Sequence, residues 1–199
     1  MRIALLRHGP TEWNALGRIQ GHTDIPLSNT GLAKIQALQP PSPFEKARAF
    51  ASPLRRARQT AEALGLEGIG CDARLMEQNW GRWEGLSRAE IIGRDGEDAF
   101  VHAGRGQDFR PPGGESTRQL NQRLAAFLKD VAREEADAIA VTHLGVLRAA
   151  YTLATGGDMA TPMPADLDIS KVMILKLTRE GTPSIEALNL DLPRKPRKP

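Results

Sequence analysis

The sequence predicts an α/β protein with helices on both faces of a central, mostly parallel sheet. Short apolar runs typical of buried strands recur along the chain, and the early ones alternate with segments that carry helix start and stop signals. The chain has 199 residues, of which 40% are hydrophobic, so it is long enough for one sizeable core. Because no internal repeat or linker divides it, we expect a single domain over residues 1–190.

The expected strands are apolar or alternating segments, the later two of which are separated by a turn at Gly181. They cover residues 2–6, 47–51, 69–75, 138–141, 171–177 and 184–190. Helices are expected where a capping residue precedes a suitable segment. They begin after Ser28, at Ser52-Pro53 (with Ser52 as the cap) and after Ser116, and a further helix covers residues 145–155.

Strand signals disappear between Gly81 and Gly114. A capping-box pattern over Ser87 and Glu90 predicts one short helix there, and the rest is rich in glycine and arginine. Long connections of this kind inside a compact domain usually carry function. We therefore expect residues 81–114 to be an insertion that lies over the active site as a lid and sets substrate specificity.

Charge is unevenly distributed along the chain. Four of the cations lie in the last six residues, and without them the net charge of +3 becomes −1. A slightly acidic body does not indicate a nucleic-acid-binding domain. Residues 191–199 are predicted to form a disordered, basic, proline-rich tail.

Other classes of protein are disfavoured by composition. No apolar run approaches the roughly 20 residues of a membrane span, and the chain enters a strand directly after Met1, so we expect neither a membrane segment nor a signal peptide. The single cysteine, Cys71, is expected to be buried and suits a reducing, cytoplasmic compartment. With one cysteine and four histidines, a Cys/His zinc site has little support.

The most informative motif is Arg7-His8-Gly9, which follows the first apolar run. A strand that ends in this way presents a cation and a nucleophilic imidazole at the carboxyl edge of the sheet, where open α/β sheets bind their ligands. A second arginine, a glutamate and a second histidine follow at similar places further along the chain: Arg56, Glu77 and His143.

Several blocks, in one order, resemble the histidine phosphatase (phosphoglycerate mutase-like) superfamily. They are residues 6–14, 17–21, 24–28, 52–61, 75–77, 81–85, 113–116 and 142–145. The resemblance implies a three-layer α/β/α sandwich and phosphoryl transfer through a phosphohistidine, with no metal and no cofactor.

The resemblance also implies a role for each core residue. His8 is the nucleophile, which must be unprotonated, a state that flanking guanidinium groups favour. Arg7 and Arg56 grip the phosphoryl oxygens, because a planar guanidinium donates two hydrogen bonds at once. Glu77 protonates the leaving oxygen and then takes a proton from water. His143 contacts the same phosphoryl group.

Further residues are expected to line the pocket. Asn14 is a predicted phosphate donor and Gln20 a predicted lining residue, and the backbone amides after His143 can donate to phosphate. Leu144 stands where the family usually has glycine, which adds bulk and would narrow the range of substrates. Pro10 replaces the acid or amide of many relatives.

Each assignment has a competitor. Arg55 competes with Arg56, although the family register selects Arg56, and Glu84 is the rival carboxylate to Glu77. Trp80 and Trp83 are interpreted as packing residues. The remaining histidines, His22 and His102, are interpreted as surface loop residues.

The sequence-based hypothesis is a metal-independent phosphomonoesterase that acts on a small phosphorylated metabolite. A phosphoglycerate mutase is the alternative within the enzyme class, but mutases of this family are longer and have more basic segments in the insertion. A binding module that only holds a phosphate ligand is the alternative of another class, and it would not require an acid–base carboxylate. The resemblance also allows a homodimer, for which the sequence indicates no interface.

Overall fold

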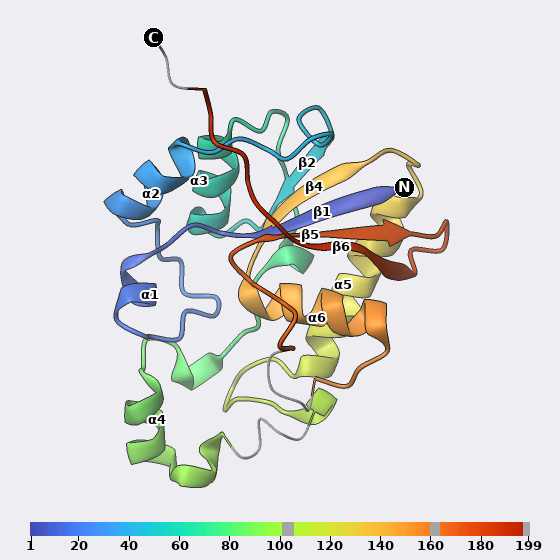
Figure 1. The fold of residues 1–199 in the computed structure, drawn as a ribbon. Helices are drawn as coiled ribbons and strands as arrows, with labels where there is room; N and C mark the ends of the chain where they lie inside the picture. The colour runs from blue at the N-terminus through green and yellow to red at the C-terminus, as the bar shows by residue number, and fades with distance from the viewer. Residues whose placement is uncertain (101–105, 160–163, 197–199) are drawn as a thin grey trace.

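The computed structural model describes residues 1–100, 106–159 and 164–196. Six strands form one sheet in the order β3-β2-β4-β1-β5-β6 (Figure 1). Their bounds are β1 (Arg2–Arg7), β2 (Arg48–Ala51), β3 (Gly70–Cys71), β4 (Ala138–Thr142), β5 (Val172–Leu177) and β6 (Pro183–Leu190). The first four are parallel, and β5 pairs antiparallel with both β1 and β6. The predicted mostly parallel sheet is confirmed.

Helices cover both faces of this sheet. One layer contains α2 (Asn29–Gln36) and α3 (Arg55–Leu64), and the other contains α5 (Thr117–Ala132) and α6 (Leu144–Thr155). The short helices α1 (Glu12–Ala15) and α4 (Arg88–Asp95) lie in the connections (Figure 1). The fold is therefore the predicted three-layer α/β/α sandwich.

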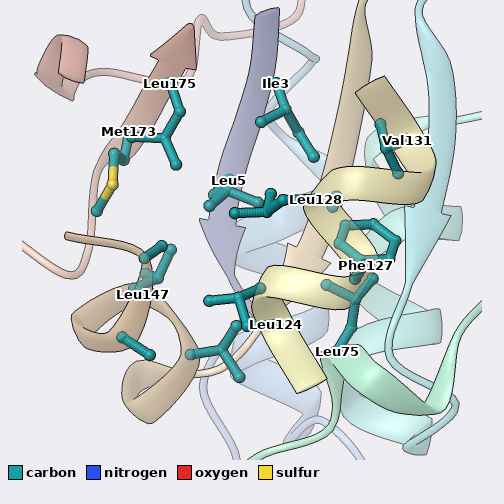
Figure 2. Close-up of a cluster of buried hydrophobic side chains, with 14 of the residues drawn as sticks. Ile3, Leu5, Leu75, Leu124, Phe127, Leu128, Val131, Leu147, Met173 and Leu175 are labelled. Carbon is teal, nitrogen blue, oxygen red and sulfur yellow. The ribbon is translucent and has the colours of Figure 1, made fainter. Parts of the chain in front are cut away.

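The alternation of side chains in β1 builds a core on each face. Ile3 and Leu5 pack with the α5–α6 layer, while Ala4 and Leu6 pack with the α2–α3 layer. Figure 2 shows the larger cluster, in which one face of α5 lies against β1. Because β1 and its neighbour β4 are buried on both faces, their ends are fixed in position.

The register of the strands alone brings His8 and His143 close together. Arg7 pairs with Thr142 in the parallel ladder, and the amide of His8 donates to the carbonyl of Thr142 at 2.9 Å. His8 and His143 therefore leave neighbouring strands at the same carboxyl edge.

Three of the four serines predicted to cap helices are N-caps in the structure. Ser28, Ser87 and Ser116 accept backbone hydrogen bonds as N-caps, as predicted. The prediction for α3 was wrong: its N-cap is Leu54, and the hydroxyl of Ser52 accepts from the Leu54 amide in a turn before the helix.

Two further expectations differ from the structure at the edges of the molecule. The strand expected over 69–75 is only the two-residue β3, and its last residue, Cys71, is exposed rather than buried because it lies on an edge strand. In the C-terminal segment, Pro193 and Lys195 make backbone hydrogen bonds with Gln39 and Ala37 after α2. The expectation of a free tail therefore does not hold at these positions; residues 197–199 lie outside the described part.

Candidate active site

His8 lies at the end of β1 with its ring 7% exposed. Its Nδ1 is 2.7 Å from the carbonyl oxygen of Gly9, so Nδ1 carries the proton and donates to that carbonyl. The other ring nitrogen, Nε2, then has its lone pair free. The local backbone thus selects the tautomer that a nucleophilic histidine requires.

The surroundings of His8 keep its imidazole neutral. Burial, followed by the positive charges of Arg7 and Arg56, lowers the pKa of His8 from 6.5 to about 3. At neutral pH the imidazole of His8 is therefore in its neutral form.

His143 is fully buried at the N-cap position of α6, directly after β4. Its ring centroid lies 5.1 Å from that of His8. Burial first, and then the neighbouring His8 and Arg56, lower the pKa of His143 well below 6.5. Among the described residues neither of its ring nitrogens has a hydrogen-bond partner.

Two arginines face these histidines. Arg56 is completely buried, and its Nη1 and Nη2 donate to the carbonyls of Thr23 and Gly21 at 2.9 and 2.7 Å. The Nε atoms of Arg7 and Arg56 are buried without a partner in the described part of the chain. Arg55 is exposed, so of the two candidate arginines in α3 the structure brings only Arg56 to the histidines.

Glu77 reaches the same edge of the sheet from the loop before the insertion. Its carboxylate accepts hydrogen bonds from the amides of Gln78 at 2.8 Å and of Gly145 at 3.0 Å. A Cβ on Gly145 would come within 2.3 Å of Glu77 Oε1, so this approach requires glycine there. The Gly145 amide, expected to donate to phosphate, thus donates to the carboxylate in the free protein.

The rival carboxylate, Glu84, has a different position. Its two oxygens accept hydrogen bonds from the backbone of His22, Thr23 and Trp80 and from the Thr23 hydroxyl. With these bonds satisfied, Glu84 holds the turn that supplies the carbonyl partners of Arg56.

His22 was interpreted as a surface residue, and the structure contradicts this. It is half-buried, and its Nε2 donates to the backbone carbonyl of Glu77 at 2.8 Å. Arg123 donates to the same carbonyl at 3.0 Å and pairs with Glu115. No sequence signal indicated these contacts, because their acceptor is a backbone group more than 40 residues away in the chain.

A cavity of about 190 Å³ lies beside His8, and of the predicted lining residues Asn14 shares it with Arg7 and His8. Asn14 Oδ1 accepts from Thr11, which leaves its amide group as the donor available to a ligand. The remaining walls are mainly apolar and come from α2, the segment before β5 and the C-terminal segment: Ile35, Leu38, Ile169 and Leu192.

The other two predicted lining residues lie outside that cavity. Gln20 is buried, with its Oε1 unpartnered among the described residues. Leu144 is half-buried as the first residue of α6, next to His143.

The insertion has a small hydrophobic core of its own. Trp83, Ile91 and Phe109 are buried together, and Trp80 packs against them. Both tryptophans are packing residues, as interpreted from the sequence. His102 lies outside the described residues.

Neither a metal-binding cluster nor a membrane helix is found in the described ranges. Over residues 1–100, 106–159 and 164–196, no three histidine, cysteine or acidic side chains are grouped so that they could hold a metal ion. Over the same ranges, no helix has the length and apolar character needed to cross a membrane.

Known proteins are similar to this chain in both sequence and fold. A phosphoserine phosphatase from Hydrogenobacter thermophilus is 31% identical over 169 residues, which are 80% of this chain and 79% of that protein. A 2,3-bisphosphoglycerate-dependent phosphoglycerate mutase from Gloeobacter violaceus is 34% identical over 63% of this chain and 60% of its own length.

A solved structure is also similar to this chain in its fold. A mycobacterial glucosyl-3-phosphoglycerate phosphatase, determined in complex with VO3, superposes with a TM-score of 0.79 at 25% identity and covers 96% of this chain and 99% of its own. The family model of the histidine phosphatase superfamily, branch 1, matches residues 3–191. The chain therefore belongs to the histidine phosphatase superfamily, branch 1.

Proposed function

We propose that this protein is a metal-independent phosphomonoesterase that hydrolyses a small phosphorylated metabolite through a phosphohistidine on His8. The observation that carries the proposal is a set of buried, unsatisfied polar atoms beside a neutral imidazole. Nε of Arg7, Nε of Arg56 and both ring nitrogens of His143 have no partner in the described part of the chain. Leaving such groups buried is costly, so the N–H donors among them, on Arg7, Arg56 and the one protonated nitrogen of His143, are expected to be completed by a ligand with several acceptor oxygens, as a phosphoryl group has.

In the proposed first step, the lone pair on His8 Nε2 attacks phosphorus. A nitrogen–phosphorus bond forms while the bond from phosphorus to the leaving oxygen breaks, and Glu77 supplies the proton that this oxygen takes. Arg7, Arg56 and His143 stabilise the charge on the three equatorial oxygens, which is the main source of catalysis in phosphoryl transfer.

In the second step, water attacks the phosphohistidine, and Glu77 accepts the proton that the water loses. Phosphate leaves, and the His8 imidazole returns to its neutral form with the proton on Nδ1. We place the control of specificity in residues 81–114.

The test is phosphate release from a panel of phosphomonoesters in excess chelator, with wild type and His8→Ala compared between about pH 5 and 8. We expect chelator-resistant release by wild type and a loss of at least about 10⁴-fold in the variant, with the fold intact by circular dichroism. Retained activity in pure His8→Ala would contradict the assignment of the nucleophile.

Wild type that releases no phosphate would move the assignment to the mutase. That activity is then measured with a bisphosphate primer. Failure of both assays, with tight binding of phosphate or vanadate, would leave the non-catalytic binding module.

A further inference from the structure

We propose that Glu84 is a positioning residue that holds two parts of the active site through one turn: the phosphate-gripping Arg56 and the proton donor Glu77. The inference rests on the proposed function for its kinetic readouts. It concerns a side chain that touches neither the nucleophile nor the predicted phosphate donors.

The turn is residues 20–24, and Glu84 fixes it from inside. Oε1 of Glu84 accepts the amide of His22 at 2.8 Å, and Oε2 accepts the amide of Thr23 at 2.8 Å and the Thr23 hydroxyl. Gly21 has a φ of +52°, and a Cβ there would lie 2.0 Å from Glu84 Oε1. The turn is thus wrapped closely around the carboxylate, at a position that only glycine suits.

One side of the turn holds Arg56. The carbonyls of Gly21 and Thr23 accept from the two terminal nitrogens of its guanidinium group. Glu84 binds the amides of the turn while Arg56 binds its carbonyls, so the three elements form one hydrogen-bonded unit. The direction in which Arg56 Nε faces the phosphoryl site therefore depends on the carboxylate of Glu84.

The other side of the turn holds Glu77. His22, whose amide Glu84 binds, donates from its ring to the Glu77 carbonyl. Glu84 also accepts from the amide of Trp80 at 3.1 Å, three residues after Glu77. The loop that carries the proton donor is therefore attached to Glu84 directly and through His22.

This arrangement gives a specific expectation for Glu84→Gln. A carboxylate offers two acceptor oxygens, whereas the glutamine amide keeps one and turns its NH₂ toward donors. Glu90→Gln is the matched control, because Glu90 is an exposed carboxylate of the same insertion that accepts the helix-capping hydrogen bond from the Ser87 amide and pairs with Arg18 at 3.6 Å.

The experiment measures two quantities for each folded variant. Orthovanadate affinity, by calorimetry, reports on Arg56 and does not require turnover. The ratio of kcat for an aryl phosphate to kcat for an alkyl phosphate reports on Glu77, because only the poor alkyl leaving group needs the proton. For Glu84→Gln we expect vanadate to bind about tenfold more weakly and the aryl-to-alkyl ratio to rise about tenfold, since small displacements in a site cost large factors.

His22→Ala separates the two sides. It removes only the donor to Glu77, so the aryl-to-alkyl ratio should rise while vanadate affinity stays within about twofold of wild type. His22→Gln, which keeps an N–H donor, should restore part of the ratio. His22→Ala should change the aryl-to-alkyl ratio less in the Glu84→Gln background than in the wild-type background. The reason is that the effects of substitutions within one hydrogen-bond network are not additive.

A folded Glu84→Gln protein with wild-type vanadate affinity and a wild-type ratio would overturn the proposal, as would equal effects in Glu90→Gln. If Glu84→Gln does not fold, Thr23→Val removes only the hydroxyl bond to Glu84, and unchanged values there would count against the proposal. If the wild type binds vanadate but hydrolyses neither ester, the proposed function is wrong. The vanadate affinities of wild type and Glu84→Gln would still show whether Glu84 positions Arg56.

Discussion

The proposed active-site residues are held in two different ways, and the difference follows the secondary structure. Arg7, His8 and His143 stand at the ends of two adjacent strands with buried interiors, where the ladder itself fixes their position. Glu77 lies in a loop and the guanidinium group of Arg56 binds the carbonyls of a turn, so both are held by hydrogen bonds between side chains and backbone groups. We call these sets the strand-held residues and the loop-held residues.

The comparison indicates which part of the chemistry is rigid and which depends on neighbours. The strands keep their groups in place even where buried polar atoms have no hydrogen-bond partner, as at the ring nitrogens of His143. Burying such atoms costs free energy. Loop-held groups have partners, which are backbone groups of Gly21, Thr23, Gln78 and Gly145. Substitutions that spare the reacting residues should therefore disturb acid catalysis and phosphate gripping more readily than the nucleophile.

Among the loop-held residues, the largest effect is expected at Arg56. Arg56→Lys keeps a positive charge but cannot reach two carbonyls and the phosphoryl group with one planar fork. We expect kcat/KM for any phosphomonoester to fall by about 10²–10³, the usual cost of losing a preorganised donor. The neighbouring exposed residue, Arg55, supplies the control, because kcat/KM of Arg55→Lys should stay within about twofold of wild type. A similar loss in both variants would show that the substitutions act by disturbing helix α3 and not by removing a phosphate donor.

A smaller and selective effect is expected at Glu77. Glu77→Gln retains an acceptor for the Gly145 amide but cannot transfer a proton. Hydrolysis of alkyl phosphates should slow by about 10²-fold or more, and hydrolysis of aryl phosphates by much less, because a phenolate leaves without protonation. Steady-state kinetics with leaving groups of graded pKa check this. Equal losses across the series would indicate that Glu77 only positions other groups.

The strand-held part of the site was predictable because its signals are local. An apolar run ending in Arg7-His8-Gly9 identifies both a strand and its edge, and a second run ends at His143 in the same way. Parallel pairing then brings such ends together whatever the loops do. The capping boxes at Ser87 and Ser116 were correct for the same reason, since donor and acceptor are three residues apart.

The loop-held part was not predictable in its details. Glu84 looked like an alternative acid, and His22 like a surface residue, because their partners are backbone atoms about 60 residues away. Backbone partners leave no trace in side-chain identity, so neither pattern nor charge reveals them. The same limit explains the C-terminal segment, where the pairing of Lys195 with Ala37 involves main-chain atoms and is invisible in a run of basic residues and prolines.

The smallest effect concerns the strand-held histidines, and it appears in stability. In the folded protein burial, with neighbouring positive charge, lowers the pKa of His8 to about 3 and that of His143 well below 6.5, whereas both return to about 6.5 on unfolding. Below pH 6.5 the unfolded chain therefore binds more protons, so stability falls as pH decreases, by up to about 1.4 kcal/mol per pH unit for each histidine.

Urea unfolding of wild type and His143→Gln at pH 7 and 5 tests this directly. The variant should lose less stability between the two pH values, because one of the two titrating groups is gone. An identical loss in both proteins would mean that His143 is protonated in the fold, and its unpartnered nitrogens would then need an acceptor such as a bound anion. Repeating the titration with added phosphate separates these cases, since an anion in the site should favour protonated imidazole and reduce the loss on acidification.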